Sequence, residues 1–214
     1  MATGPSTTQS PYLVPNAPGV SFTSVISSGD AVGTRSDGVP YRFVGVPDGI
    51  GAYDNGDGTI TVLVNHEIGT STSNVDNSIT AQGIVREHGS AGGFVSRLKV
   101  DKQTLQVRDA EDLAERIFLF NTQTGQYEQG TTVFQRLCSG DLPDVSAFFD
   151  AASNTGTQSR IYMTGEETGP PFTPNYGRPF AFVATGPEAG QHLRAAPPRR
   201  LRLGELGRQP ELGP

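Results

Sequence analysis

Hydrophobic residues along the chain come in short runs, and clusters of Gly, Pro, Asn and Asp separate one run from the next. The clearest run is 59–65, where Ile60, Val62 and Val64 alternate with Thr59 and Thr61. Alternation with a period of two is typical of a β-strand that buries one face. Runs of the same kind predict strands at 20–26, 41–46, 94–100, 116–120, 131–134, 161–164 and 180–184.

Only two stretches favour a helix. They are 110–115 and 144–152, and Asp144 is a candidate N-cap for the second. The separators 54–58, 91–93 and 169–171 contain the residue types that turns require. Many short strands joined by turns predict an all-β sandwich, barrel or propeller with short helical insertions. No exact internal repeat singles out the propeller.

Composition narrows the class of protein. The chain has 214 residues, which is enough for one domain with a real core or at most two small ones. Its apolar runs are far shorter than the roughly 20 residues of a membrane-spanning helix. The single Cys excludes a disulfide framework and a zinc site built on several thiolates. The net charge of −6 argues against a nucleic-acid partner, because phosphate contacts require clustered Lys and Arg.

A Gly-rich loop is the first candidate for chemistry. Asp54, Asn55 and Asp57 offer oxygen atoms of the kind that calcium binds. The loop lacks the spacing of an EF-hand and its final bidentate acid. A hairpin turn explains the same residues, so both interpretations stay open.

The end of the run 59–65 is the second candidate. Asn65, His66 and Glu67 follow an apolar strand directly, so these three side chains emerge together where the strand leaves the sheet. Side chains of these types bind metals or take part in catalysis at such positions. A purely structural role is the alternative.

The segment around the lone cysteine is the third candidate. Arg136 and Asp141 flank Cys138 and predict a polar loop, in which a thiolate ligand or a nucleophile is plausible. An inert buried cysteine is the alternative.

Two further polar segments complete the set. Glu166 and Glu167 follow a predicted strand and are able to bind one cation or bridge two, unless they are solvated turn acids. His88 lies beside a Gly-rich turn and is either a phosphate or metal contact or part of a surface loop.

These candidates share a mixture of donor atoms. His66, Glu67, Cys138, Glu166 and Glu167 supply nitrogen, sulfur and oxygen from strand ends and loops. Such a mixture favours iron or a mixed-metal cluster over structural zinc.

Several segments match a known pattern when they are taken in combination. They are Asp48-Gly49-Ile50-Gly51-Ala52-Tyr53, Val64-Asn65-His66-Glu67, His88-Gly89 with 93–96 and 101–102, Cys138-Ser139-Gly140, and Gly165-Glu166-Glu167. In these segments the chain resembles the PhoX-type alkaline phosphatase family. The resemblance extends from about residue 9 to residue 190.

The resemblance implies a periplasmic or extracellular β-propeller that hydrolyses small-molecule phosphate monoesters with iron and calcium. It places Cys138 as the thiolate ligand of iron and Glu167, with Glu166 as the competing choice, as an acid near the metals. The remaining metal-ligand candidates are Asn65, His66, Glu67, Asp54 and Asp57.

The same resemblance suggests roles in catalysis. We expect Cys138, Glu67 and Arg136 to be the catalytic residues. Metal ions would polarise the phosphoryl oxygens and generate the attacking nucleophile. Arg136 or Arg86 would steady the charge of the transferred phosphoryl group.

The last 23 residues differ in composition from the rest. Five of the 16 basic residues but only two of the 22 acidic ones lie in 192–214, so residues 1–191 carry a net charge of −9. Back-translated with suitable codons and read one base later, this segment gives T-Y-E-L-P-R-L-G-D-F-G-W-E-N-S-V. That string is similar to the continuation found in the PhoX-type family. We therefore expect a frameshift near Gln191, which resequencing of the locus would test.

These expectations divide the chain into three parts. They are a flexible N-terminus without a signal peptide (1–10), a partial PhoX-like propeller domain (11–191) and a non-native, disordered Arg/Pro-rich tail (192–214). A propeller blade takes about 40–50 residues, so we expect an incomplete propeller, made of its N-terminal blades, with weak or no activity. The alternative function is a non-catalytic, calcium-binding propeller module at the cell surface.

Overall fold

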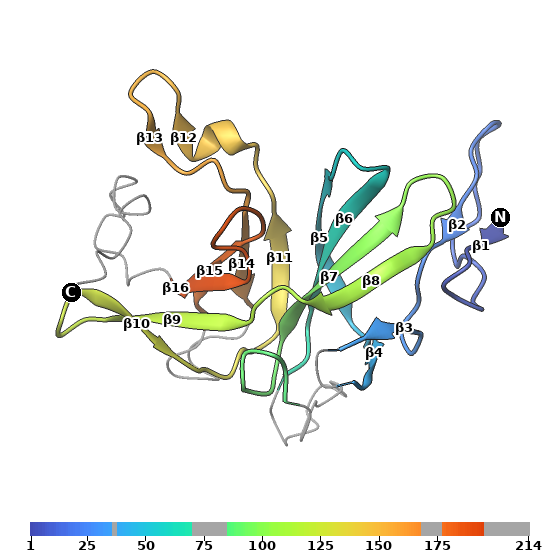
Figure 1. Cartoon of the computed structure of the whole chain (residues 1–214). Coiled ribbons are helices and arrows are strands. Elements are labelled where there is room, and N and C mark those ends of the chain that lie inside the picture. The colour runs from blue at the N-terminus through green and yellow to red at the C-terminus, as the bar shows by residue number, and fades with distance from the viewer. Residues whose placement is uncertain (36–37, 70–84, 168–176, 195–214) are drawn as a thin grey trace.

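The structure, a computed structural model, describes residues 1–35, 38–69, 85–167 and 177–194 (Figure 1). Almost all of the regular structure in these residues is β-strand, and the one helical element is a single 3-10 turn, η1 (Val145–Ala147). The prediction of an all-β protein is therefore confirmed. The described strands do not close into a barrel or a propeller.

A four-stranded antiparallel sheet contains the clearest alternating run of the sequence. Its strands, in spatial order, are β5 (Pro47–Asp54), β6 (Thr59–His66), β7 (Phe94–Asp101) and β8 (Val107–Asp112). The predicted strands 59–65 and 94–100 are thus confirmed, because β6 and β7 cover them. Each strand pairs with the one that follows it in the chain. Short turns join β5 to β6 and β7 to β8, whereas the long segment 67–93 connects β6 to β7.

The second large sheet has six strands. Their spatial order is β10 (Gln126–Gly130), β9 (Arg116–Asn121), β16 (Gln191–Arg194), β15 (Pro179–Val183), β14 (Ile161–Glu166) and β11 (Leu137–Asp141). Strand β16 lies parallel to β9 and antiparallel to β15, so the chain returns late to fill the gap between them. The first three residues of the expected tail belong to this strand, and residues 195–214 lie outside the described residues.

Three two-stranded pairs surround the large sheets. They are β1 (Ala2–Thr3) with β2 (Thr23–Ser24), β3 (Ala31–Thr34) with β4 (Pro40–Arg42), and β12 (Phe149–Asp150) with β13 (Thr155–Gly156). In Figure 1 the β12–β13 hairpin extends away from the six-stranded sheet as an arm.

Strand β6 separates two hydrophobic cores. Val64 faces the first core, in which β3, β4, β7 and β8 supply the neighbouring side chains. Leu63 faces the second core, in which the four-stranded and six-stranded sheets meet. Successive side chains of a strand point to opposite faces. Asn65 and Glu67 therefore lie on the same face as Leu63, whereas His66 lies on the same face as Val64. The fold therefore sends adjacent candidate residues to different environments.

Both predicted helices are wrong. The stretch 110–115 contains good helix formers, but its first residues complete β8, where Ala110 pairs with Leu98 and Asp112 with Ser96. Pairing and burial against β7 override the local preference for helix. In 144–152, Asp144 makes no side-chain cap and only η1 forms, because β12 then turns to pair with β13. The predicted strand 131–134 is reduced to an isolated bridge at Phe134.

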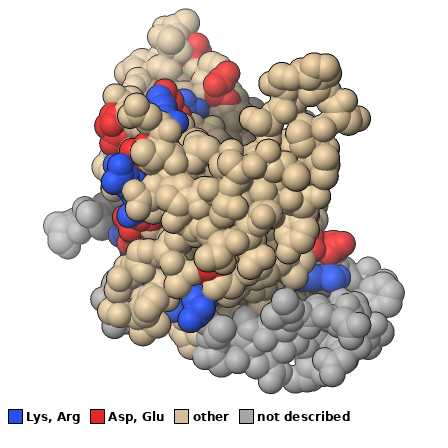
Figure 2. Space-filling model, turned by 90° about the vertical axis from the view of Figure 1, so that its right-hand side faces the viewer, with Lys and Arg blue, Asp and Glu red and all other residues tan. Residues whose placement is uncertain are grey.

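Charged residues of both signs are interspersed on the surface. On the face shown in Figure 2, uncharged residues predominate; most of the charged side chains lie along the left side in mixed order, and a further group of both signs lies at the lower right. In the part of the chain that the structure describes, no helix is long and apolar enough to cross a bilayer.

Candidate metal centre

Three potential metal ligands converge where the two large sheets meet. The ligand atoms of Asp48, Glu67 and Cys138 all lie within 4.8 Å of one another. Asp48 is exposed, whereas Glu67 and Cys138 are half-buried, so the group is open to solvent on one side. The cluster combines two carboxylates that the sequence supplies at strand ends with the only thiol of the chain.

Strand pairing explains why these residues meet. Pro47 pairs with His66, so the beginning of β5 and the end of β6 lie side by side and bring Asp48 close to Glu67. Strand β11 of the other sheet packs against β5 and β6 and carries Cys138. A Cβ atom on Gly49 would lie 2.8 Å from the Cys138 carbonyl oxygen, so this close approach of two backbones requires glycine.

Negative charge accumulates around Glu67. Burial raises the pKa of its carboxyl, and the neighbouring Glu167 and Asp48 carboxylates raise it further, while Arg136 acts in the opposite direction. Arg136 is itself 3.3 Å from Glu167, Nε to Oε2. The site thus combines three carboxylates and a thiol with one guanidinium, an arrangement that a bound cation would stabilise.

The donor set fits a transition metal. Carboxylate oxygen together with thiolate sulfur suits iron or zinc, whereas calcium prefers six to eight oxygen ligands. Asp48, Glu67 and Cys138 are the residues that would hold the ion, and Glu167 is near enough to influence Glu67. The arrangement of Cys138 and Glu67 is compatible with their predicted metal role, which itself stays a prediction.

Asn65 lies beside this group but uses its polar atoms elsewhere. Its amide nitrogen donates to the carbonyl oxygen of Ser139 and the hydroxyl of Thr164, both at 2.9 Å, and more weakly to Cys138 O at 3.3 Å. Its oxygen accepts a hydrogen bond from the Tyr162 hydroxyl at 3.0 Å. Asn65 therefore ties β6 to β11 and β14.

The two adjacent glutamates differ in their surroundings. The Glu166 side chain is fully buried and accepts hydrogen bonds from the backbone of Gln135 and from the backbone and guanidinium of Arg178. Glu167 is half-exposed and lies against Arg136 on the side of the cluster. Of the two competing choices, the geometry favours Glu167 as the acid near a metal.

His66 lies on the opposite face of β6, in the first core. Its Nε2 is 2.7 Å from the hydroxyl of Ser96, which also bonds the Tyr41 hydroxyl at 2.6 Å. Burial lowers the pKa of His66 to about 4, so the ring is neutral at physiological pH. It stacks on Phe94, with ring centroids 4.2 Å apart. The fold thus separates His66 from Glu67.

Arg86 belongs to the same buried network. Its guanidinium forms a bidentate ion pair with Asp112 and lies over the Phe94 ring, 3.5 Å from the centroid. Asp112 also accepts from Tyr41 and from the backbone of Glu87. These bonds hold Arg86 inside the protein, so Arg136 is the better placed of the two arginines for an incoming anion.

His88 is buried against Phe134. Within the described residues, neither of its ring nitrogens makes a hydrogen bond of good geometry, and burial lowers the pKa of the imidazole. It is not among the ligand atoms that converge at Asp48.

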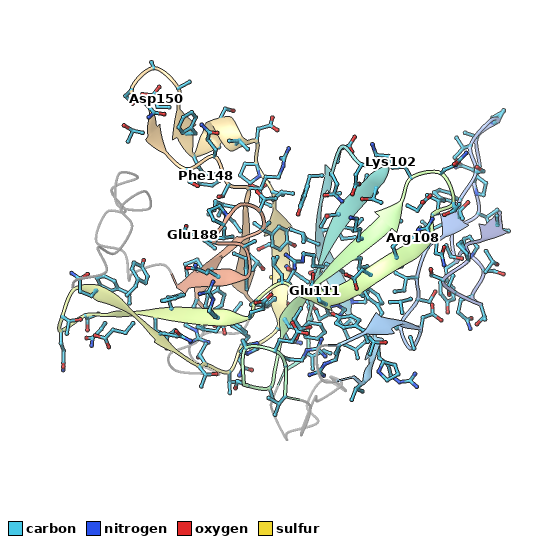
Figure 3. The ribbon with its side chains drawn as sticks, in the orientation of Figure 1. Lys102, Arg108, Glu111, Phe148, Asp150 and Glu188 are labelled. Atoms are coloured by element: carbon cyan, nitrogen blue, oxygen red, sulfur yellow. The ribbon has the colours of Figure 1, made fainter. Side chains whose placement is uncertain are left out.

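Asp54 and Asp57 form a hairpin turn at the other end of β5 and β6. Asp54 accepts from the backbone of Gly56 and pairs with Lys102, the first residue of the β7–β8 connection, which Figure 3 labels beside the tip of the β5–β6 hairpin. Asp57 accepts from Thr59 and pairs with Lys99, and these contacts lower its pKa to about 2. Both carboxylates thus pair with lysine ammonium groups and accept hydrogen bonds within the turn, so the arrangement supports the turn interpretation.

Asp48 is the residue of the candidate metal centre that the sequence did not identify as a ligand. It stands at the start of a glycine-rich segment, in which Gly49 and Gly51 are the sequence signal for a close backbone approach.

A cavity of about 480 Å³ lies away from the candidate metal centre, between the β12–β13 arm and β14–β15. Figure 3 shows Phe148 and Asp150 on that arm and Glu188 beside β15 and β16. None of the three converging ligand residues lines this cavity.

A scan against protein-family models, a search of curated proteins and a search of solved structures each found no match for this chain.

Proposed function

We propose that this chain is part of a PhoX-type, metal-dependent phosphatase that hydrolyses phosphate monoesters of small molecules. The observation that carries the proposal is the convergence of Asp48, Glu67 and Cys138. Two of these residues had been selected from the sequence for a metal role, and the third lies in a segment of the family pattern. The resemblance supplies the reaction class, iron and calcium as the metals, and a periplasmic or extracellular location.

In this proposal the residues of the site divide into metal ligands and a residue that binds the phosphoryl group. Asp48, Glu67 and Cys138 hold the ion, which when bound would act as a Lewis acid on a phosphoryl oxygen. Arg136, whose side chain is about a quarter exposed, would neutralise the charge of the phosphoryl group. In the free protein Arg136 pairs with Glu167. A bound phosphate group would compete with Glu167 for this arginine, so substrate binding would shift Arg136 from the carboxylate to the phosphate.

The proposal includes a propeller architecture for the whole protein. The sheet β5–β8 has the four antiparallel strands of a propeller blade. A second sheet packs on its face through a shared hydrophobic core, as neighbouring blades do. The metal ligands would then lie between two blades. The described strands do not close into a ring, and we expect a version with the reading frame restored to be the more active one.

Hydrolysis of an aryl phosphate tests the proposal. The chain and its frame-restored version are assayed after iron and calcium loading, each beside a Cys138→Ala variant. We expect the frame-restored version to turn over the substrate and Cys138→Ala to abolish this turnover, whereas an inactive frame-restored version, or a Cys138→Ala variant as active as it, would overturn the assignment. Calcium binding without iron, together with indifference to this substitution, would instead support the binding module.

A further inference from the structure

Two residues next to the candidate metal centre join the strands that carry its ligands. The Tyr162 hydroxyl on β14 lies 3.0 Å from both the Asn65 side-chain oxygen on β6 and the Gly49 carbonyl oxygen on β5. The Asn65 amide in turn donates to the backbone of Cys138 and Ser139 on β11. Hydrogen bonds from this pair therefore reach β5 and β11, and Asn65 itself belongs to β6.

The pair is completely buried, with 0% exposure for both Asn65 and Tyr162. A buried amide or phenol is costly unless it is hydrogen-bonded. The Asn65 nitrogen has two hydrogens for three acceptors, and the Tyr162 hydroxyl has one hydrogen for two. All three donor hydrogens of the pair thus have acceptors, and these include the carbonyl groups of Gly49, Cys138 and Ser139.

Glycines make room for the pair. A Cβ on Gly140 would collide with the Tyr162 hydroxyl, and a Cβ on Gly51 would lie 3.0 Å from the Tyr162 ring. A Cβ on Gly49 would lie 2.8 Å from the Asn65 amide nitrogen. Three glycines from β5 and β11 therefore form a slot that fits this tyrosine and this asparagine.

We propose that Asn65 and Tyr162 are positioning residues that set the distance between Asp48 and Cys138 and so preorganise the metal centre. The inference rests on the proposed metal function, and it assigns Asn65 a role other than that of a ligand. Tyr162 holds the carbonyl of Gly49, the residue after Asp48. Asn65 holds the carbonyl of Ser139, the residue after Cys138, at 2.9 Å and contacts the Cys138 carbonyl more weakly at 3.3 Å. Because both act through the backbone, they place the two ligands without touching the ion.

Cobalt(II) titration of the full chain tests this role. Cys138 is the only thiol, so near-ultraviolet thiolate-to-cobalt absorption reports on this site alone. Tyr162→Phe keeps the ring and removes the hydroxyl, and we expect it to weaken cobalt binding about 10-fold to 100-fold, as loss of an outer-shell partner does. Tyr53→Phe is the matched control, because its hydroxyl bonds the Ala184 carbonyl at 3.2 Å outside this pair.

The possible outcomes separate the two proposals. No thiolate-to-cobalt band in the parent chain, or a band that survives Cys138→Ala, would overturn the metal site and the positioning role together. A parent band that Cys138→Ala abolishes but Tyr162→Phe leaves unchanged in affinity and shape would overturn the positioning role alone. Weakening in Tyr162→Phe but not in Tyr53→Phe, with circular dichroism unchanged, supports it.

A second variant covers the case in which Tyr162→Phe does not fold. Asn65→Leu is close in volume and removes both amide hydrogens, so the bonds to the Cys138 and Ser139 carbonyls are lost. We expect it to weaken cobalt binding about 10-fold to 100-fold. Full cobalt affinity in a folded Asn65→Leu variant would count against the positioning role.

Discussion

The thiol of Cys138 and the carboxylate of Asp48 lie within 4.8 Å of each other, although they belong to different sheets. Their proximity depends on the packing of β11 against β5 rather than on any local sequence feature. The candidate metal centre thus forms where the two sheets meet. Substitutions in this part of the protein can distinguish residues that stabilise the fold from residues that bind the metal ion.

The neighbouring glutamates provide the first such separation. Glu166→Gln breaks a buried ion pair with Arg178, so we expect a loss of about 3–5 kcal/mol in the free energy of unfolding. Glu167→Gln alters a half-exposed pair and should cost less than about 1 kcal/mol. It should nevertheless weaken cobalt binding, because Glu167 adds negative charge beside Glu67. Urea unfolding and cobalt titration of both variants check this, and a larger destabilisation by Glu167→Gln would contradict it.

The buried pair of Arg86 and Asp112 is the second case. Both side chains are almost inaccessible, at 4% and 2% exposure, so Arg86→Met leaves Asp112 without its countercharge. We expect a loss of about 3–5 kcal/mol in urea unfolding. Arg108→Met, which alters the exposed pair with Asp101, is the control and should cost less than about 1 kcal/mol. Equal effects of the two variants would show that the Arg86 network adds no more than a surface pair.

The acid Glu87 predicts a pH dependence of stability. Burial, with Asp112 and Glu111 nearby, raises its pKa from 4.5 to about 7. The unfolded chain therefore loses this proton at lower pH than the folded chain, so stability falls as pH rises between those two values. Glu87→Gln should match the parent near pH 4 and exceed its stability above pH 7 by about 1 kcal/mol or less, because the group is partly solvated. Thermal unfolding at both pH values measures the difference, and a variant less stable at high pH would contradict the sign.

We expect that substitution of the two acids in the β5–β6 turn does not change calcium binding. Asp54 and Asp57 pair with Lys102 and Lys99 in this structure. The double substitution Asp54→Asn with Asp57→Asn should therefore leave any calcium affinity of the chain unchanged. Calorimetric titration with calcium tests this, and a calcium site that the double substitution removes would restore the calcium interpretation of the loop.

The sequence was a good guide where a strand buries one face and exposes or half-exposes the other. Strand β6 was predicted almost to its bounds because Val62 and Val64 alternate with polar threonines. The predicted helix 110–115 overlaps the last three residues of β8, which have little apolar alternation, and only pairing with β7 determines their conformation. Local preference fails in such segments, since the energy that decides comes from another part of the chain.

The candidate site was predictable only in part, for a similar reason. Glu67, Cys138 and Arg136 have residue types that suggest chemistry, and the sequence supplied all three. Whether such residues meet depends on which face of a strand each occupies and on how the sheets pack. That geometry placed Asn65 among backbone carbonyls, sent His66 to the opposite core and brought in Asp48.

Metal content of the purified chain tests the central claim most directly. We expect the parent chain, loaded with iron and then desalted, to retain the metal in elemental analysis. Cys138→Ala should lose it while remaining folded by circular dichroism. A parent chain that retains no transition metal, or a Cys138→Ala variant that retains as much as the parent, would contradict the proposed centre of Asp48, Glu67 and Cys138.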